Sequence, residues 1–182
     1  MKGSRNHTRE ILLGNLIDVL QVVDQLPCAI FWRFGYRRFT PDLKYKEQAY
    51  AGVARACLES TLMSLRALDE FFQTGGYPDD IRAEDYPGFQ DVGGFLTRSK
   101  RDRINKHIAH FTVERASNRV LLWAYKAEIV NAAVKVTKFL DYLIADFLGT
   151  QDDLTLQVNR LRESLPFFVM ELGAGMDLAV DE

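Results

Sequence analysis

The stretch INKHIAHFT, residues 104–112, places two of the chain's three histidines three residues apart. They lie in the most basic part of the sequence. Between Arg98 and Arg119 there are seven lysines and arginines but only two acidic residues, a net charge of +5. Such an electropositive island can attract a polyanion, although the whole chain carries a net charge of −2. An acidic segment directly precedes the island and can instead neutralise it within the fold.

Helical geometry groups the side chains of this region. At about 100° per residue, one polar stripe runs along this helix. Its members are Arg103 at about 0°, His107 at about 40°, His110 at about −20° and Glu114 at about 20°. An adjacent apolar stripe consists of Ile104, Ile108 and Phe111. The histidines therefore border the face that we expect to be buried, where a cleft between helices or subunits would lie. Asn105 falls on the opposite side of the helix from Arg103.

Three interpretations of this stripe remain open from the residues alone. His110 can be a histidine at the edge of the core, bonded to a backbone carbonyl or to Glu114. Arg103 and Glu114 can belong to a solvated, salt-bridged face. The His-x-x-His pair can also bind zinc or nickel together with Glu114, but this needs a further ligand, and the one remaining histidine is His7. We expect no metal ion and no cofactor.

The string RDRINKHIAHFTVER, preceded by ESTLMSLRALDEFF and an acidic Asp-Asp loop, resembles the abortive-infection-like branch of the HEPN superfamily. The similar part runs from Glu59 to Arg115, about a third of the chain. HEPN proteins are small helical bundles, often homodimers. Many are metal-independent ribonucleases of toxin–antitoxin, phage-defence and RNA-processing systems. Their signature is an arginine, four to six residues, and then a histidine.

The resemblance implies roles for six residues. Arg103 and His110 would be catalytic in the cleavage of a phosphodiester by the RNA's own 2′-hydroxyl. The imidazole would move a proton and the guanidinium would stabilise charge on the phosphate oxygens. Substrate binding would fall to Asn105, His107, Lys106 and Arg101. In such families the site lies at a dimer interface, so two copies of the patch would face one RNA.

Two arginine–histidine pairings fit the signature. Arg103 and His110 have six residues between them, the longest spacing of the pattern, and Arg103 is followed by the apolar Ile104. Arg101 and His107 have five residues between them, and Arg101 is followed by a polar residue, but their side chains point further apart around a helix. This imperfect spacing favours an alternative function, a non-enzymatic HEPN-like dimeric module that binds a partner protein or a nucleotide.

Partners and location are expected from the same observations. We expect a homodimer, RNA as a ligand, and an antitoxin or nucleotidyltransferase as a protein partner. The N-terminal sequence has no apolar signal-peptide core, and no apolar run is long enough to cross a bilayer. These features predict a cytoplasmic protein without membrane association. Cys28 and Cys57 form no metal-binding or redox motif and are expected to be reduced.

Composition predicts one globular domain. The chain has 182 residues, of which 47% are apolar and 26% charged, which suits a single core. The segment from 75 to 94 contains five glycines, two prolines and five acidic residues, which predicts a loop that is either functional or mobile. A flexible tail is expected from about residue 173.

Apolar residues recur every three or four positions in most of the chain, which predicts helices with one buried face. The expected core residues include Leu12, Leu16, Val19, Leu20 and Val23 with Ile11 and Leu26 at the ends, then Met63 or Leu62, and later Ala127, Val130 and Val134. We expect helices over about 5–26, from Thr40-Pro41 to Gly75, over about 95–114, over about 117–148, and a shorter one over 152–165 that ends before Pro166. The helix from Thr40 carries an arginine, Arg66, within an apolar stretch. The sequence therefore predicts an all-α protein, an antiparallel bundle of four to five helices that is HEPN-like.

Overall fold

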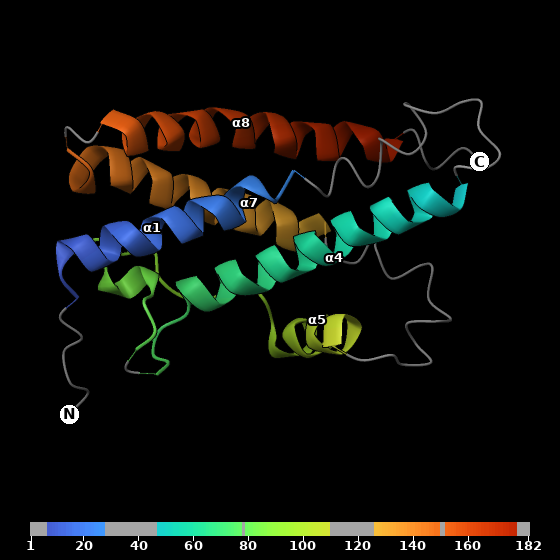
Figure 1. The fold of residues 1–182 in the computed structure, drawn as a ribbon, viewed down its shortest axis with the longest axis horizontal. Coiled ribbons are helices and arrows are strands. Elements are labelled where there is room, and N and C mark those ends of the chain that lie inside the picture. Colours follow the sequence, from blue (N-terminus) through green and yellow to red (C-terminus); the bar gives the residue numbers. More distant parts are fainter. Residues whose placement is uncertain (1–6, 28–46, 78, 110–125, 150–151, 178–182) are drawn as a thin grey trace.

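The protein is described here by a computed structural model that covers residues 7–27, 47–77, 79–109, 126–149 and 152–177. Of residues 47–55, 107–109, 152 and 171–177 it describes the backbone only. The described part contains five α-helices and no strand: α1 (Arg9–Asp24), α4 (Glu47–Phe72), α5 (Arg98–Ala109), α7 (Lys126–Tyr142) and α8 (Asp152–Asp177). The prediction of an all-α protein is confirmed (Figure 1).

The first helix forms for the reasons that the sequence indicates. Thr8 caps α1, because its hydroxyl accepts a hydrogen bond from the backbone N–H of Ile11 at 3.4 Å. One face of the helix is buried and contains most of the predicted residues, Leu12, Leu16, Val19, Leu20 and Val23, whereas Ile11, expected at its end, is 48% exposed. The predicted helix is therefore confirmed, and its apolar face forms one side of the core.

The second predicted helix corresponds to α4. Its expected beginning at Thr40-Pro41 lies outside the described residues, and its end at Phe72 is followed by Gly75 and Gly76, both with positive φ. Leu62 is buried and Met63 is 57% exposed, which decides which of the two belongs to the core. Arg66 is exposed and pairs with Glu70 at 3.1 Å, so the apolar surroundings in the sequence do not bury it.

The helix α7 buries a different face from the predicted one in its first half. Ala127 and Val134 were expected in the core but are exposed. The buried positions are Ile129, Ala132, Ala133 and Val136. The prediction assigned the larger apolar side chains to the core. The packed face instead carries two adjacent alanines, whose small side chains let the neighbouring helix approach closely. From Leu143 to Phe147 the helix continues as a π-helical turn, which shifts the register of its last residues.

The prediction that the last helix ends before Pro166 is wrong. α8 continues to Asp177 with Pro166 in its interior. Proline removes a backbone hydrogen bond and costs about 3 kcal/mol inside a helix. The residues beside it, Leu165 and Phe168, are only 2% and 3% exposed, so core packing on both sides of the proline offsets that cost. α8 packs mainly against α7. Residues 178–182 of the expected flexible tail lie outside the described residues.

The loop between α4 and α5 is part of the core. It includes a short 3-10 turn, η2 (Ala83–Asp85), and inserts Tyr86 and Phe89 among the aromatic rings of α4 and α7. Phe139 lies at the centre, with ring centroids 5.1 Å from those of Phe71, Tyr86 and Phe89. The hydroxyl of Tyr86 donates to the carbonyl of Leu12 at 2.9 Å, and burial raises the pKa of Tyr86. The loop is therefore held from both sides.

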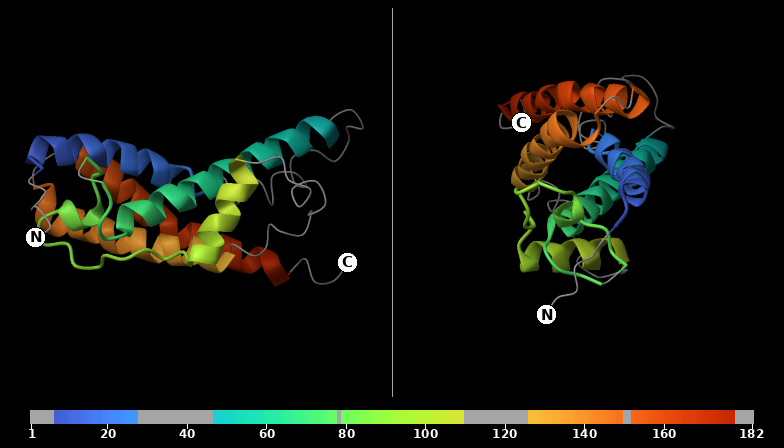
Figure 2. Two further views of the ribbon diagram at one scale, coloured as in Figure 1. Left: turned by 90° about the horizontal axis from the view of Figure 1, so that it is seen from below. Right: turned by 90° about the vertical axis from the view of Figure 1, so that its left-hand side faces the viewer.

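The arrangement of the helices places α5 at the edge of the molecule. α1, α4, α7 and α8 form the main bundle, and α5 lies across α4 on the side opposite to α8 (Figures 1 and 2). Within the described ranges, no helix is both long and apolar enough to cross a membrane.

Candidate functional site

The basic helix α5 is attached to the bundle by a narrow face. Ile104 is fully buried, and α5 packs mainly against α4. Lys100 pairs with Glu128 of α7, with 3.2 Å between Nζ and Oε1. The helix begins after Thr97, whose hydroxyl accepts a hydrogen bond from the N–H of Lys100 at 3.3 Å. The predicted helix is thus confirmed as far as Ala109, and the rest of its expected length lies outside the described residues.

A buried carboxylate fixes where α5 begins. Asp69 is 0% exposed, and its Oδ1 accepts hydrogen bonds from the N–H groups of Phe95 at 2.7 Å and Leu96 at 2.6 Å. Its Oδ2 accepts a bond from the side-chain amide of Gln73 at 2.7 Å. Arg101 Nε lies 2.9 Å from the same oxygen, at an angle that makes the contact ionic rather than a hydrogen bond. Asp69 therefore joins α4 to α5.

The contacts of Asp69 engage one of the predicted substrate-binding residues. The guanidinium of Arg101 is ion-paired with Asp69 and also donates to the carbonyl of Leu96 at 3.1 Å. Its side chain is 33% exposed. The sequence contained an indication of this link between α4 and α5, because Asp69 interrupts the apolar face of LRALDEFF. The role of Asp69 was nevertheless not predicted.

Close packing around Asp69 leads to a stability prediction. A Cβ on Gly94 would lie 2.7 Å from Asp69 Oδ1 and 2.9 Å from the Cγ of Gln73, so Gly94→Ala is expected to lower the free energy of unfolding by about 1–3 kcal/mol. The matched control is Gly14→Ala in the interior of α1, where nothing lies within 4 Å. That change is expected to raise stability by about 0.5–1 kcal/mol. Urea unfolding of both variants checks the opposite signs, and equal effects would contradict the packing.

Other cations of α5 point to solvent. Arg98, Arg103 and Lys106 are exposed, and none has a hydrogen bond or ion pair with another residue that the structure describes. Arg103 follows the paired Arg101 and precedes the buried Ile104, so the backbone beside it is anchored while its own guanidinium is exposed. The structure therefore separates the basic residues into two that hold the helix and three that face outward.

Asn105 lies on the opposite side of α5 from Arg103. It is half-buried, and its Oδ1 is buried without a hydrogen-bond partner among the described residues. The backbone of His107 belongs to α5, but its side chain lies outside the described residues, as do the whole of His110 and Glu114. The pairing of Arg103 with His110 stays a prediction, and so does the metal-binding alternative.

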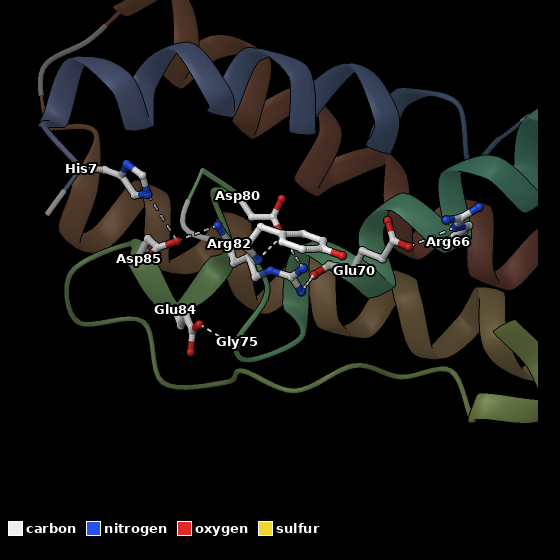
Figure 3. Close-up of polar contacts among 9 residues, drawn as sticks. His7, Arg66, Glu70, Gly75, Asp80, Arg82, Glu84 and Asp85 are labelled. Atoms are coloured by element: carbon white, nitrogen blue, oxygen red, sulfur yellow. Dashed lines mark hydrogen bonds and ion pairs between the residues drawn. The ribbon is translucent and has the colours of Figure 1, made fainter. Parts of the chain in front are cut away.

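A second polar region lies where the sequence predicted a functional or mobile loop. A groove of about 520 Å³ is bounded by α1, α4 and the segment from Tyr77 to Arg82. Arg82 lies at its rim, where its guanidinium donates to the carbonyl of Glu70 at 2.7 Å and to Asp80 Oδ2 at 2.8 Å (Figure 3). Arg66 pairs with Glu70 beside it.

Polar contacts beside this groove hold the loop residues to one another and to α4. Glu84 accepts a hydrogen bond from the N–H of Gly75 at 2.8 Å, and Asp85 accepts one from the N–H of Arg82 at 2.8 Å. His7 Nε2 lies 3.9 Å from Asp85 Oδ2 (Figure 3). Arg82 also satisfies a carbonyl in the last turn of α4, as cations near helix C-termini commonly do. The cluster fastens the loop to α4 and leaves α5 as the better candidate site.

One acidic residue of the loop is directed toward α7 rather than toward α5. Asp91 pairs instead with two lysines of α7, Lys138 at 2.9 Å and Lys135 at 3.2 Å. The hydrogen bond from Lys138, followed by that from Lys135, holds the pKa of Asp91 below its ordinary value.

Comparisons with known proteins add no assignment to this geometry. No protein-family model, no curated protein and no solved structure matches the chain.

Proposed function

We propose that the outward face of α5 binds and cleaves single-stranded RNA, so that the chain acts as a HEPN-like, metal-independent endoribonuclease of a defence or toxin–antitoxin system. The observation that supports this most is the state of Arg103. Its guanidinium is exposed and unpaired within the described residues, on a helix that three neighbouring residues hold in place. An exposed guanidinium without a protein partner among the described residues is available to phosphate oxygens, which its forked donors suit.

The proposed reaction uses the nucleophile of the RNA itself. The 2′-hydroxyl attacks the adjacent phosphorus, the bond to the 5′-oxygen breaks, and a 2′,3′-cyclic phosphate and a 5′-hydroxyl are formed. Arg103 stabilises the charge that builds up on the non-bridging oxygens. Seven positions correspond to about two turns of an ideal helix, so the sequence spacing of Arg103 and His110 predicts that both side chains lie on one stripe. His110 transfers the proton as general base or acid.

Lys106 and His107 have proposed roles around this pair. Lys106 contacts a neighbouring phosphate, because it is exposed, unpaired among the described residues and about 60° from Arg103 around the helix. His107 is assigned to the same stripe by its place in the sequence, and its proposed role is to orient the phosphate. Arg101 and Asn105 act through the fold rather than on the RNA, since Arg101 is ion-paired with Asp69 and the Oδ1 atom of Asn105 is buried.

Purified full-length protein, incubated with end-labelled single-stranded RNA in excess EDTA, is expected to cleave it. His110→Ala is expected to reduce the cleavage rate by about 100-fold or more, because the proton-transferring group is lost. The far-UV circular dichroism of the variant should match that of the wild type, which excludes unfolding as the cause. Cleavage at an unchanged rate by His110→Ala would contradict the proposed site.

One observation favours the second function, a non-enzymatic module that binds a partner protein or a nucleotide. Arg101, whose spacing to His107 fits the HEPN signature better, is engaged by the buried Asp69. A protein of this kind would bind through α5 without cutting. Saturable RNA or nucleotide binding, with no cleavage product under any condition, would support it over the ribonuclease.

A further inference from the structure

The outer face of α8 carries an apolar stripe. Leu156, Phe167 and Met170 are 68%, 60% and 61% exposed, although all three are large hydrophobic residues. They are separated by eleven and three positions, so they fall within about 60° of one another around the helix. The buried residues of α8 occupy the opposite face and include Val158, Leu161, Leu165 and Phe168. A row of apolar residues along one side of a helix is the arrangement by which helices pack on one another.

Two opposite charges lie within this row. Arg160 and Glu163 are both exposed and occur between Leu156 and Phe167. Neither makes an ion pair or hydrogen bond with another residue in the described ranges; the nearby Arg162 pairs with Asp141 instead. The spacing along the row, from 156 to 160, 163, 167 and 170, alternates between four and three. This is the spacing by which one helix packs along another.

We infer that this face of α8 binds the same face of a second copy of the chain, antiparallel, about a twofold axis between residues 161 and 162. A twofold axis at this point places Leu156 opposite the partner's Phe167 and Arg160 opposite the partner's Glu163. By symmetry, the apolar contact and the ion pair each occur twice. Met170 falls opposite the partner's Asp153, outside the paired segment, so residues 156 to 167 carry the contact. Moving the pairing by one helical turn would place Arg160 or Glu163 opposite an apolar residue, so the charges favour this register.

The position of α8 makes this interface distinct from the proposed RNA site. α8 lies at the edge of the bundle on the side opposite to α5 (Figures 1 and 2). Pairing through α8 therefore leaves both α5 helices on the outer sides of the dimer. This differs from the arrangement that the HEPN resemblance implies, in which the two basic patches face one RNA. The inference stands whether or not α5 cleaves RNA.

Sedimentation equilibrium of the full chain measures the dimer directly. We expect a monomer–dimer equilibrium for the wild type, and a predominantly monomeric Leu156→Glu/Phe167→Glu double variant. Both residues are exposed, so thermal unfolding should be nearly unchanged. The matched control is Met63→Glu on α4, which also replaces a largely exposed apolar residue, at 57%, and should leave the dimer intact.

Charge exchange tests the antiparallel register. Arg160→Glu alone and Glu163→Arg alone each place like charges opposite one another twice and should weaken the dimer by about tenfold or more. The Arg160→Glu/Glu163→Arg double variant restores both pairs and should recover dimerisation. A monomeric wild type would overturn the inference. The same result is expected if another segment of the same chain, rather than a second copy, covers this face of α8. A dimer that ignores the apolar substitutions, or that the charge exchange does not rescue, would also overturn it.

Discussion

Asp69→Ala is expected to lower the free energy of unfolding by about 3–5 kcal/mol, a large part of the stability of a domain of this size. The carboxylate is 0% exposed and receives the N–H groups of Phe95 and Leu96 as well as the amide of Gln73. Alanine would leave these buried donors without an acceptor and would leave Arg101 without its counter-charge. Chemical unfolding monitored by circular dichroism measures the loss.

The matched control for Asp69 is Asp102→Ala. Asp102 is an exposed aspartate on α5, one residue after Arg101, so its removal should change stability by less than about 0.5 kcal/mol. Asp69→Asn keeps one carbonyl oxygen for Phe95 and Leu96 but turns an amide donor toward other donors, and should fall between the two. A loss below about 1 kcal/mol for Asp69→Ala would contradict its role as the link between α4 and α5.

Arg103→Ala is expected to lower the rate of RNA cleavage by about 100-fold to 1,000-fold, which is typical of removing one group that stabilises transition-state charge. Stability should hardly change, because the side chain is exposed and has no partner among the described residues. Arg103→Lys should recover only part of the rate, since an ammonium keeps the charge but loses the forked contact with two phosphate oxygens. Single-turnover kinetics with excess enzyme measures the chemical step.

Substitutions of two other arginines distinguish a loss of catalysis from a loss of net charge and from a loss of stability. Arg66→Ala removes an exposed arginine of α4 that pairs with Glu70, and should leave cleavage within about twofold of the wild type. Arg101→Ala should reduce thermal stability together with activity, because Asp69 loses its ionic partner. Equal losses of activity in Arg66→Ala and Arg103→Ala, at equal stability, would show that only net charge matters.

Much of the fold could be predicted from apolar periodicity. The predicted face of α1 is confirmed except at Ile11, because large aliphatic residues recur there at regular helical spacing. In α7 the same reasoning failed at Val134, which is 51% exposed, because Ala132 and Ala133 form the packed face. At Pro166 a local rule predicted a helix end, but burial of Leu165 and Phe168 outweighed it. In both cases the outcome depends on tertiary packing, and the apolar pattern of the sequence does not show which elements pack together.

The candidate site was predictable in part. The pattern correctly predicted that Arg103 and Ile104 lie on different faces of a helix, one exposed and one buried. It also predicted that Asn105 lies away from Arg103. It did not predict the pairing of Arg101 with Asp69, because residues 32 positions apart in the chain come together only through the packing of α5 on α4. The partners of buried charges are long-range properties of a fold.

The central claim is that the face of α5 cleaves RNA through the RNA's own 2′-hydroxyl. Two oligonucleotides of identical sequence test it most directly, one all-RNA and one with deoxyribose at each linkage that is cut, both incubated with the wild-type protein in excess EDTA. The account predicts cleavage of the first, with 2′,3′-cyclic phosphate ends, and none of the second. Cleavage of both at equal rates, or cleavage of the first only when a divalent metal is restored, would contradict it.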